Sequence, residues 1–277
     1  MTVLVTGGTG KTGRRLVARL RENGLACRVA ARGVTAADGT RAFDWTRSDT
    51  WNGALEDVSA VYLVAPAIDG DPAGIVIDFA RLAIERGMRR FVLLSASLLP
   101  AGGPAMGQVH QWLEQNAPEW TVLRPSWFMQ NFSEGQHVAT IQEENSIYSA
   151  TENGRVPFVS ADDIAAAAMT ALTCTSALDN DFILTGRELL SYDEVARRIS
   201  EAVGRTISHR RLSAEKLATR YQSLGLSSAH GQMLAAMDSA IASGAEDRVT
   251  SCIEDLTGRP PTPFDAFVAA SAPKWSS

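Results

Sequence analysis

The chain has 277 residues, of which 45% are hydrophobic and 21% charged, and its formal net charge is −5. This composition is typical of a globular protein with a sizeable core and excludes a largely disordered chain. The chain has no run of Lys and Arg to neutralise phosphates, which argues against nucleic acid as a partner.

The first half of the chain alternates short runs of β-branched residues with longer segments of helical period. We expect strands at 3–6, 27–31, 60–65, 91–95 and 121–124, with a weaker strand that ends at Phe43. The expected helices between them are 11–22, 49–55, 73–86 and 105–115. This alternation predicts the α/β fold class, with a Rossmann-like, doubly wound parallel sheet and helices on both faces.

The rhythm of the sequence changes after Pro125. We expect short strands near Ile147 and Val156, helices from Ala161 and Ser191, a strand at 182–185 and a largely helical tail. We interpret 1–277 as one domain, to which 126–277 contribute a smaller, mostly helical substrate lobe.

Apolar stripes at helical spacing run through 213–243 and predict core packing rather than a binding groove. Their members are Leu217, Tyr221, Leu224, Met233, Leu234 and Met237.

The N-terminal residues include neither a basic segment nor a long apolar stretch, so we expect a cytoplasmic protein that does not associate with membranes. The three cysteines form no CxxC pair and the four histidines are scattered. Neither a disulfide framework nor a metal site is expected.

The clearest motif is a glycine-rich segment between the first expected strand and the first expected helix. Glycines are required there because the turn is tight, the backbone must approach a pyrophosphate closely, and the helix must pack near the strand. The free N–H groups at the helix start then face the phosphate charge. The motif predicts a dinucleotide site formed by Thr6, Gly7, Gly8, Thr9, Gly10, Lys11, Thr12 and Gly13.

The same segment also resembles the end of a P-loop at Gly10, Lys11 and Thr12. A P-loop requires another glycine five positions before Gly10, and that position is Val5. Nucleoside triphosphate chemistry is therefore disfavoured.

Arg32 stands at the end of the second expected strand, roughly 20 residues past the glycines, where NAD-specific sites carry an acidic residue. A guanidinium at this point suits a 2′-phosphate, which favours NADP (NADPH) as the cofactor. The alternative is a solvated arginine at a strand end.

Together with motifs further along the chain, these residues resemble the NmrA-like branch of the atypical short-chain dehydrogenases, and within it the festuclavine and agroclavine dehydrogenases. The resemblance covers most of the chain and fades after about Arg211. The motifs that carry it are Phe43-Asp44-Trp45, 62–66, 91–97, 102–110, 123–132, 157–165 and 189–195.

The resemblance implies a cofactor lined by residues that follow the third to sixth strands. Ligands of open α/β sheets lie at these carboxyl ends, which agrees with that placement. The cofactor residues so implied are Asp44, Trp45, Val64, Ala65, Pro66, Ser95, Ala96 and Pro125. The implied substrate residues are Met106, Trp127, Phe128, Phe132 and Tyr148, although each aromatic could equally be a core residue.

Standard members of the larger family reduce ketones with a YxxxK pair, whose tyrosine protonates the developing alkoxide. No tyrosine of this chain precedes a lysine by four positions. Loss of the acid costs roughly two to four decades in the rate of carbonyl reduction. Hydride addition to an iminium discharges an existing cation and needs no proton, as the resemblance to the ergot-alkaloid dehydrogenases also implies. We therefore expect an NADPH-dependent reductase of a small-molecule iminium.

His110 and Ser97 are the candidate catalytic residues. His110 could orient the substrate or donate a proton, or could pack beside Trp112, and Ser97 could be a buried capping serine. Two other functions stay open: a quinone or enone reductase with Ser97, His110 or Tyr148 as donor, and a non-catalytic NAD(P)-sensing protein. The oligomeric state also stays open, with a homodimer among the alternatives.

Overall fold

The computed structural model describes residues 1–32, 39–66 and 71–275, and the chain divides into two compact units. The first unit comprises Met1–Pro125, Ala161–Leu184 and Cys252–Arg259. The second comprises Ser126–Ser160, Thr185–Ser251 and Pro260–Ser277. Two stretches of the expected lobe, 161–184 and 252–259, thus lie in the first unit, because their helices and strand pack on the central sheet and its helices.

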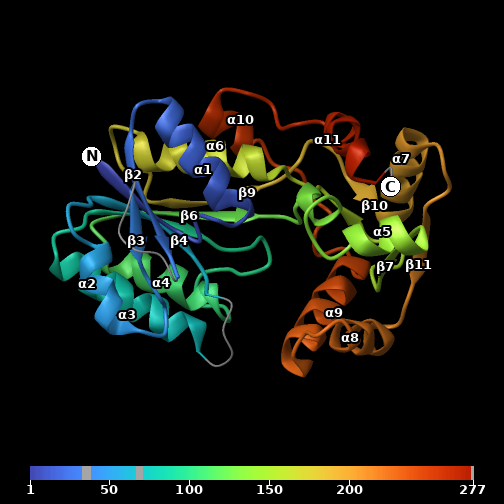
Figure 1. Ribbon diagram of the computed structural model, residues 1–277, viewed down its shortest axis with the longest axis horizontal. Coiled ribbons are helices and arrows are strands. Elements are labelled where there is room, and N and C mark those ends of the chain that lie inside the picture. The colour runs from blue at the N-terminus through green and yellow to red at the C-terminus, as the bar shows by residue number, and fades with distance from the viewer. Residues whose placement is uncertain (33–38, 67–70, 276–277) are drawn as a thin grey trace. The chain divides into compact units, whose positions relative to one another are not determined.

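A parallel sheet forms the centre of the first unit, with the strand order β3-β2-β1-β4-β5-β6-β9 (Figure 1). The order reverses between β1 and β4, and such a reversal is where open α/β sheets bind ligands. The predicted fold class is confirmed. The strands are β1 (Thr2–Thr6), β2 (Ala26–Ala31), β3 (Thr40–Ala42), β4 (Ala60–Val64), β5 (Arg90–Leu94), β6 (Glu119–Pro125) and β9 (Asn180–Leu184).

Helices cover both faces of this sheet (Figure 1). One face carries α1 (Lys11–Glu22), α6 (Ala161–Thr173) and α10 (Cys252–Thr257). The other carries α2 (Trp51–Ala54), α3 (Pro72–Glu85) and α4 (Met106–Asn116), with the short η1 (Ser48–Thr50) before α2.

Strand β4 shows why the sheet is apolar on both faces. Tyr62 is fully buried, and its hydroxyl donates to Thr12 Oγ1 on α1 at 3.2 Å. Its neighbour Leu63 belongs to the core cluster that contains Phe79 of α3. Successive side chains therefore enter the two cores in turn, as expected for a strand buried on both sides.

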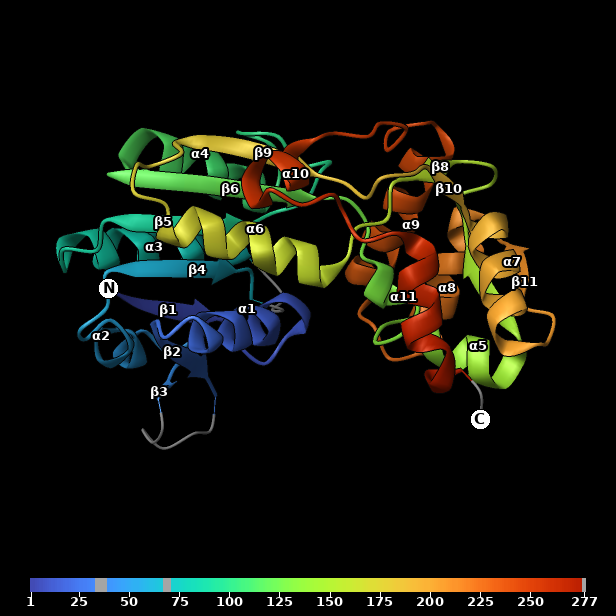
Figure 2. The same cartoon turned by 90° about the horizontal axis from the view of Figure 1, so that it is seen from above.

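The second unit combines two small sheets with helices around an aromatic core. The sheets pair β7 with β11 in parallel and β8 with β10 in antiparallel, and Figure 2 shows α7 lying against β11. Its elements are η2 (Met129–Asn131), α5 (Val138–Glu144), β7 (Ser146–Ser149), β8 (Arg155–Val156), β10 (Leu190–Ser191), α7 (Tyr192–Val203), β11 (Ser208–Arg211), α8 (Ala214–Ser223), α9 (Ser228–Ala242), α11 (Phe264–Ser271) and η3 (Ala272–Lys274).

The helical stripes of 213–243 were predicted correctly only in part. Leu217 and Tyr221 are buried, which confirms core packing for them. Leu224 and Met233 are 57% and 50% exposed, so core packing is wrong for these two. Leu224 lies beyond the last turn of α8, and α9 buries a different face, through Gly231, Ala235, Asp238 and Ile241.

No helix within the described ranges is both long enough and apolar enough to cross a membrane.

Candidate active site

The glycine loop joins β1 to α1 and leaves room only for backbone. Gly7 has φ of +61°, and a Cβ on it would lie 3.0 Å from Cβ of Val64 at the end of β4. A Cβ on Gly13 would lie 2.2 Å from the carbonyl oxygen of Gly7. Helix α1 begins after Gly10 with no side-chain cap and no acidic residue in its first turn. The N-terminus of such a helix attracts an anion such as a pyrophosphate.

Two threonines of the motif hold this loop rather than face a ligand. Thr6 is fully buried; its hydroxyl donates to the Tyr62 carbonyl at 2.9 Å and accepts from the Val64 amide at 2.8 Å. Thr12 is buried against the Tyr62 hydroxyl. Thr6 fixes the carboxyl ends of β1 and β4 side by side, and Thr12 joins α1 to β4.

A cavity of about 540 Å³ opens at the carboxyl ends of β1, β2 and β4. Its volume lies in the range of small-molecule and cofactor sites. It brings together many of the predicted cofactor residues and adds Ala30, Ala31, Phe43 and Thr46, which sequence reasoning missed. The lining residues are Gly7, Thr9, Ala30, Ala31, Arg32, Phe43, Asp44, Trp45, Thr46, Val64, Ala65 and Pro66.

The cavity combines a cation, an anion and an aromatic wall. Asp44 accepts hydrogen bonds from the amide and hydroxyl of Thr46 at 2.9 and 2.8 Å. These bonds, helped by the charge of the exposed Arg32, hold the pKa of Asp44 below its ordinary value. The Trp45 ring meets Phe43 edge to face at 4.8 Å and is fixed by that contact. The arrangement offers a guanidinium for a phosphate and an ionised carboxylate for a hydroxyl donor.

Ser95 and Ser97 follow β5 at the same edge of the sheet. Ser95 donates its amide to the Leu123 carbonyl at 2.8 Å, whereas its buried hydroxyl has no hydrogen-bond partner in the described residues. Ser97 is buried, and its amide donates to the carbonyl of Pro125, the last residue of β6, at 2.9 Å. Ala96 lies between them, half-buried. This hydroxyl is therefore available to a polar group bound at this edge. This hydroxyl and the glycine loop together fit a nicotinamide dinucleotide.

His110 and Met106 are both buried side chains of α4. His110 is 3% exposed, and its ring centroid lies 5.7 Å from that of Trp120 near the start of β6. Five residues of strand separate Trp120 from Pro125, or roughly 16 Å. Burial lowers the pKa of His110, so its ring is neutral at pH 7. Met106 is buried in the core cluster of the first unit. The structure gives both residues a packing environment.

The four aromatic substrate candidates belong to the second unit. Phe132 is fully buried and stacks on His137 with ring centroids 5.0 Å apart. Trp127 is half-buried and packs against the same core, and Phe128 is half-buried beside a backbone bridge to Val159.

Tyr148 makes contacts through both its hydroxyl and its ring. Its hydroxyl donates to Glu144 Oε2 at 2.7 Å, and the Arg220 guanidinium lies 3.8 Å from the ring centroid. The hydrogen bond to Glu144 raises the pKa of Tyr148. Because its proton is already engaged by a carboxylate, Tyr148 is a poor donor in this arrangement.

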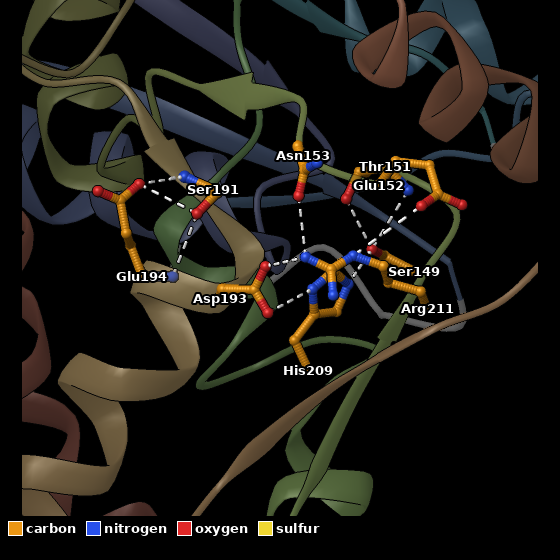
Figure 3. Close-up of polar contacts among 9 residues, drawn as sticks. All are labelled: Ser149, Thr151, Glu152, Asn153, Ser191, Asp193, Glu194, His209 and Arg211. Carbon is orange, nitrogen blue, oxygen red and sulfur yellow. Dashed lines mark hydrogen bonds and ion pairs between the residues drawn. The ribbon is translucent and has the colours of Figure 1, made fainter.

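A network of polar side chains in the second unit connects residues that are distant in the sequence (Figure 3). His209 Nε2 lies 2.7 Å from Ser149 Oγ, and His209 Nδ1 lies 3.3 Å from Asp193 Oδ1. Ser149 Oγ also lies 2.7 Å from Thr151 Oγ1, and Arg211 pairs with Asp193. The order serine, histidine, aspartate is that of a hydrolase triad, but Ser149 and Thr151 are fully buried, so no substrate carbonyl can reach the hydroxyl. This network instead connects β7, β11 and the start of α7. Sequence spacing gave no signal for it, because the three elements lie far apart along the chain.

Comparisons with known proteins show the family to which the chain belongs. A sequence model of the NAD(P)H-binding family matches residues 7–175. The chain is 43% identical to the agroclavine dehydrogenase of Claviceps fusiformis, over 99% of each chain, and 38% identical to a festuclavine dehydrogenase of Aspergillus fumigatus, also over 99% of each.

Among solved structures, the triphenylmethane reductase of Citrobacter sp. complexed with NADP(H) shares the fold, with a TM-score of 0.79 and 21% identity over 98% of this chain and 100% of that one. The chain belongs to the NAD(P)H-binding family and is an NmrA-like atypical short-chain dehydrogenase, an NAD(P)H-dependent oxidoreductase related to the agroclavine and festuclavine dehydrogenases.

Proposed function

We propose that this protein is an NADPH-dependent reductase that delivers hydride to a preformed cyclic iminium. The observation that carries the proposal is the missing acid. No tyrosine of the sequence precedes a lysine by four positions, and the residues that directly follow β5 include serines and no tyrosine or lysine. An iminium acceptor is the electrophile that makes a proton donor unnecessary.

NADPH is preferred over NADH in this proposal because of Arg32. Its guanidinium lies at the end of β2 in the same cavity as Trp45 and the glycine loop. A phosphate gains charge-assisted hydrogen bonds from a guanidinium, whereas a bare ribose hydroxyl gains little. Asp44, with its lowered pKa, remains an acceptor for a neighbouring hydroxyl or amine.

The bound dinucleotide supplies a hydride, and the residues of the chain supply position and environment. The glycine loop and the N-terminus of α1 hold the phosphates. Thr6 keeps the ends of β1 and β4 together, and the buried Ser95 hydroxyl is available to orient a polar group at the edge. When hydride reaches the iminium carbon, the π electrons become the nitrogen lone pair. A cation disappears and no proton has to arrive, so fixed geometry accounts for the rate.

The names of the relatives also support this choice. The curated proteins similar over nearly the whole chain include agroclavine dehydrogenases and festuclavine synthases. We transfer the class of substrate and not the ergot scaffold.

The experiment is NADPH oxidation against four small electrophiles: a cyclic iminium, a ketone, an enone and a quinone. The same panel with NADH is the control. Selective turnover of the iminium is the expected result. Selective turnover of the quinone or enone would replace the proposal with that activity. Tight NADPH binding without turnover of any of the four would favour the NAD(P)-sensing alternative.

A further inference from the structure

The wall of the cavity that contains Asp44 and Trp45 lies outside the sheet. Strand β3 ends at Ala42, and next to that end the Phe43 amide donates to the Ala31 carbonyl at 3.0 Å. The pairing of β2 with β3 does not continue into this wall. A backbone segment outside a sheet keeps one conformation where other groups bind its amides and carbonyls. The position of the wall therefore depends on hydrogen bonds from elsewhere in the first unit.

The Thr50 hydroxyl binds this wall directly. Its Oγ1 accepts the Asp44 amide at 3.0 Å and donates to the Arg47 carbonyl at 2.7 Å. Thr50 directly precedes α2, where a threonine usually accepts an amide of the first helical turn, but its side chain makes no such bond. The hydroxyl thus holds the segment before η1 instead of the start of the helix.

Trp51 binds the carbonyl of the same aspartate. Its Nε1 donates to the Asp44 carbonyl at 3.1 Å. The Trp51 ring is 7% exposed and meets Phe79 of α3 edge to face, with ring centroids 5.7 Å apart. Phe79 also meets the Trp45 ring, at 5.3 Å. The side chains of Thr50 and Trp51 together fix the amide and the carbonyl of Asp44 relative to a buried ring of α3.

Thr50 and Trp51 stand behind the cavity wall and are not among the residues that line the cavity. Asp44, Trp45 and Thr46 line it, and the Asp44 carboxylate accepts both the amide and the hydroxyl of Thr46. A change at Thr50 therefore reaches a ligand through the residues that Thr50 holds.

We propose that Thr50 is a positioning residue for NADPH, which acts through Asp44 on the half of the dinucleotide that carries the 2′-phosphate. The inference rests on the proposed function. Arg32, the expected partner of that phosphate, lines the same cavity as Asp44. The residues directly before them, Ala31 and Phe43, share a backbone hydrogen bond, so both side chains follow paired strand ends. A displaced wall should weaken the binding of this half and leave hydride transfer at the other half unchanged.

The test measures binding to the full chain by titration calorimetry. The probes are NADPH and adenosine 2′,5′-bisphosphate, which is its adenosine half with the 2′-phosphate. Thr50→Val keeps the shape of the side chain and leaves the Asp44 amide without its acceptor. We expect the Kd of both probes to rise by the same factor, about fivefold to tenfold. Thr50→Ser restores the hydroxyl and should bind both probes as tightly as the wild type.

The matched control is Thr173→Val in α6. Thr173 is half-buried like Thr50, and its hydroxyl donates to the Met169 carbonyl at 2.8 Å. The carbonyl of the next residue, Cys174, accepts from Arg90 at the start of β5, which places the control at the amino edge of the sheet. Thr173→Val should leave both Kd values unchanged.

Steady-state kinetics separate positioning from a general loss of structure. Thr50→Val should raise the KM for NADPH by the factor found for Kd and leave kcat unchanged, because the reacting half is not displaced. Trp51→Phe provides a second variant if Thr50→Val does not fold. It keeps an aromatic ring against Phe79, removes the donor to the Asp44 carbonyl, and should raise the Kd of adenosine 2′,5′-bisphosphate about threefold.

The outcomes distinguish the two proposals. Equal Kd values for adenosine 2′,5′-bisphosphate in the wild type and Thr50→Val overturn the positioning role, even if the iminium is reduced. A loss of affinity that Thr50→Ser does not restore, or that Thr173→Val shares, overturns it as well. A loss of affinity that Thr50→Ser restores, in a protein that does not reduce the iminium, overturns the proposed function and keeps the positioning role.

Discussion

Replacing Gly13 by alanine tests the glycine loop most directly. The new Cβ would lie 2.2 Å from the Gly7 carbonyl oxygen and 2.8 Å from both the Gly7 carbonyl carbon and Gly8 Cα. All three are backbone atoms, so no side chain can rotate away and the loop or the start of α1 must move. Overpacking of this kind costs about 1–3 kcal/mol, and the gain in helix propensity from Gly to Ala returns about 1 kcal/mol.

The free energy of NADPH binding should change more than the free energy of unfolding. The same displacement moves the amides that face the pyrophosphate, and a loss of about 3 kcal/mol corresponds to roughly a hundredfold weaker Kd for NADPH. The assays are fluorescence titration of NADPH and thermal unfolding without cofactor. Gly53→Ala in α2 is the control, because a Cβ at this position would meet no atom within 4 Å. We expect this variant to bind NADPH with the affinity of the wild type. If Gly13→Ala bound NADPH with the wild-type Kd, the account of the loop as a phosphate cradle would be wrong.

Three further predictions concern single charges and one packed ring. Arg32→Ala should raise the Kd for NADPH about tenfold and leave that for NADH nearly unchanged, as parallel titrations of the two cofactors would show; equal changes would remove Arg32 from phosphate recognition. His110→Ala should leave the pH profile of kcat unchanged while lowering the Tm, because the ring packs on Trp120; an altered profile would restore its acid–base role. Burial raises the pKa of Asp238 from 3.8 to about 7, so the stability that this carboxyl contributes below pH 4 is lost as the pH rises through 7. Asp238→Asn should therefore match the wild type near pH 4 and exceed it by about 4 kcal/mol at pH 9 in urea unfolding, whereas a constant difference across pH would contradict the raised pKa.

The sequence predicts the elements of residues 1–125 because their signals are local. A β-branched run, a glycine-rich segment and an amphipathic helix follow one another within residues 2–22, and the structure has β1 and α1 there. Phe43 and Thr46 were missed as cavity residues, although an aspartate two positions before a threonine is itself a turn signal and occurs here at Asp44 and Thr46.

For the second unit, the sequence predicts helices and strands but not which of their side chains are buried or in contact. Helical period marked α8 and α9, but period does not say which face meets a partner, which is why Leu224 and Met233 were assigned to the core and are exposed. Asp238 gave no signal in sequence, since its burial depends on contact with Ala150, 88 positions earlier. The same holds for His209, which meets Ser149 only through the pairing of β7 with β11.

The measurement that tests the central claim most directly is a single-turnover reaction with NADPH deuterated at the transferred position and a saturating permanent cyclic iminium. We expect one deuterium on the former iminium carbon of the amine product, at a rate that stays constant between about pH 6 and 8 because no protein acid takes part. A transfer rate that falls with the deprotonation of a single group would mean that the protein does supply a proton. Bound NADPH with no transfer of deuterium to the iminium would contradict the account.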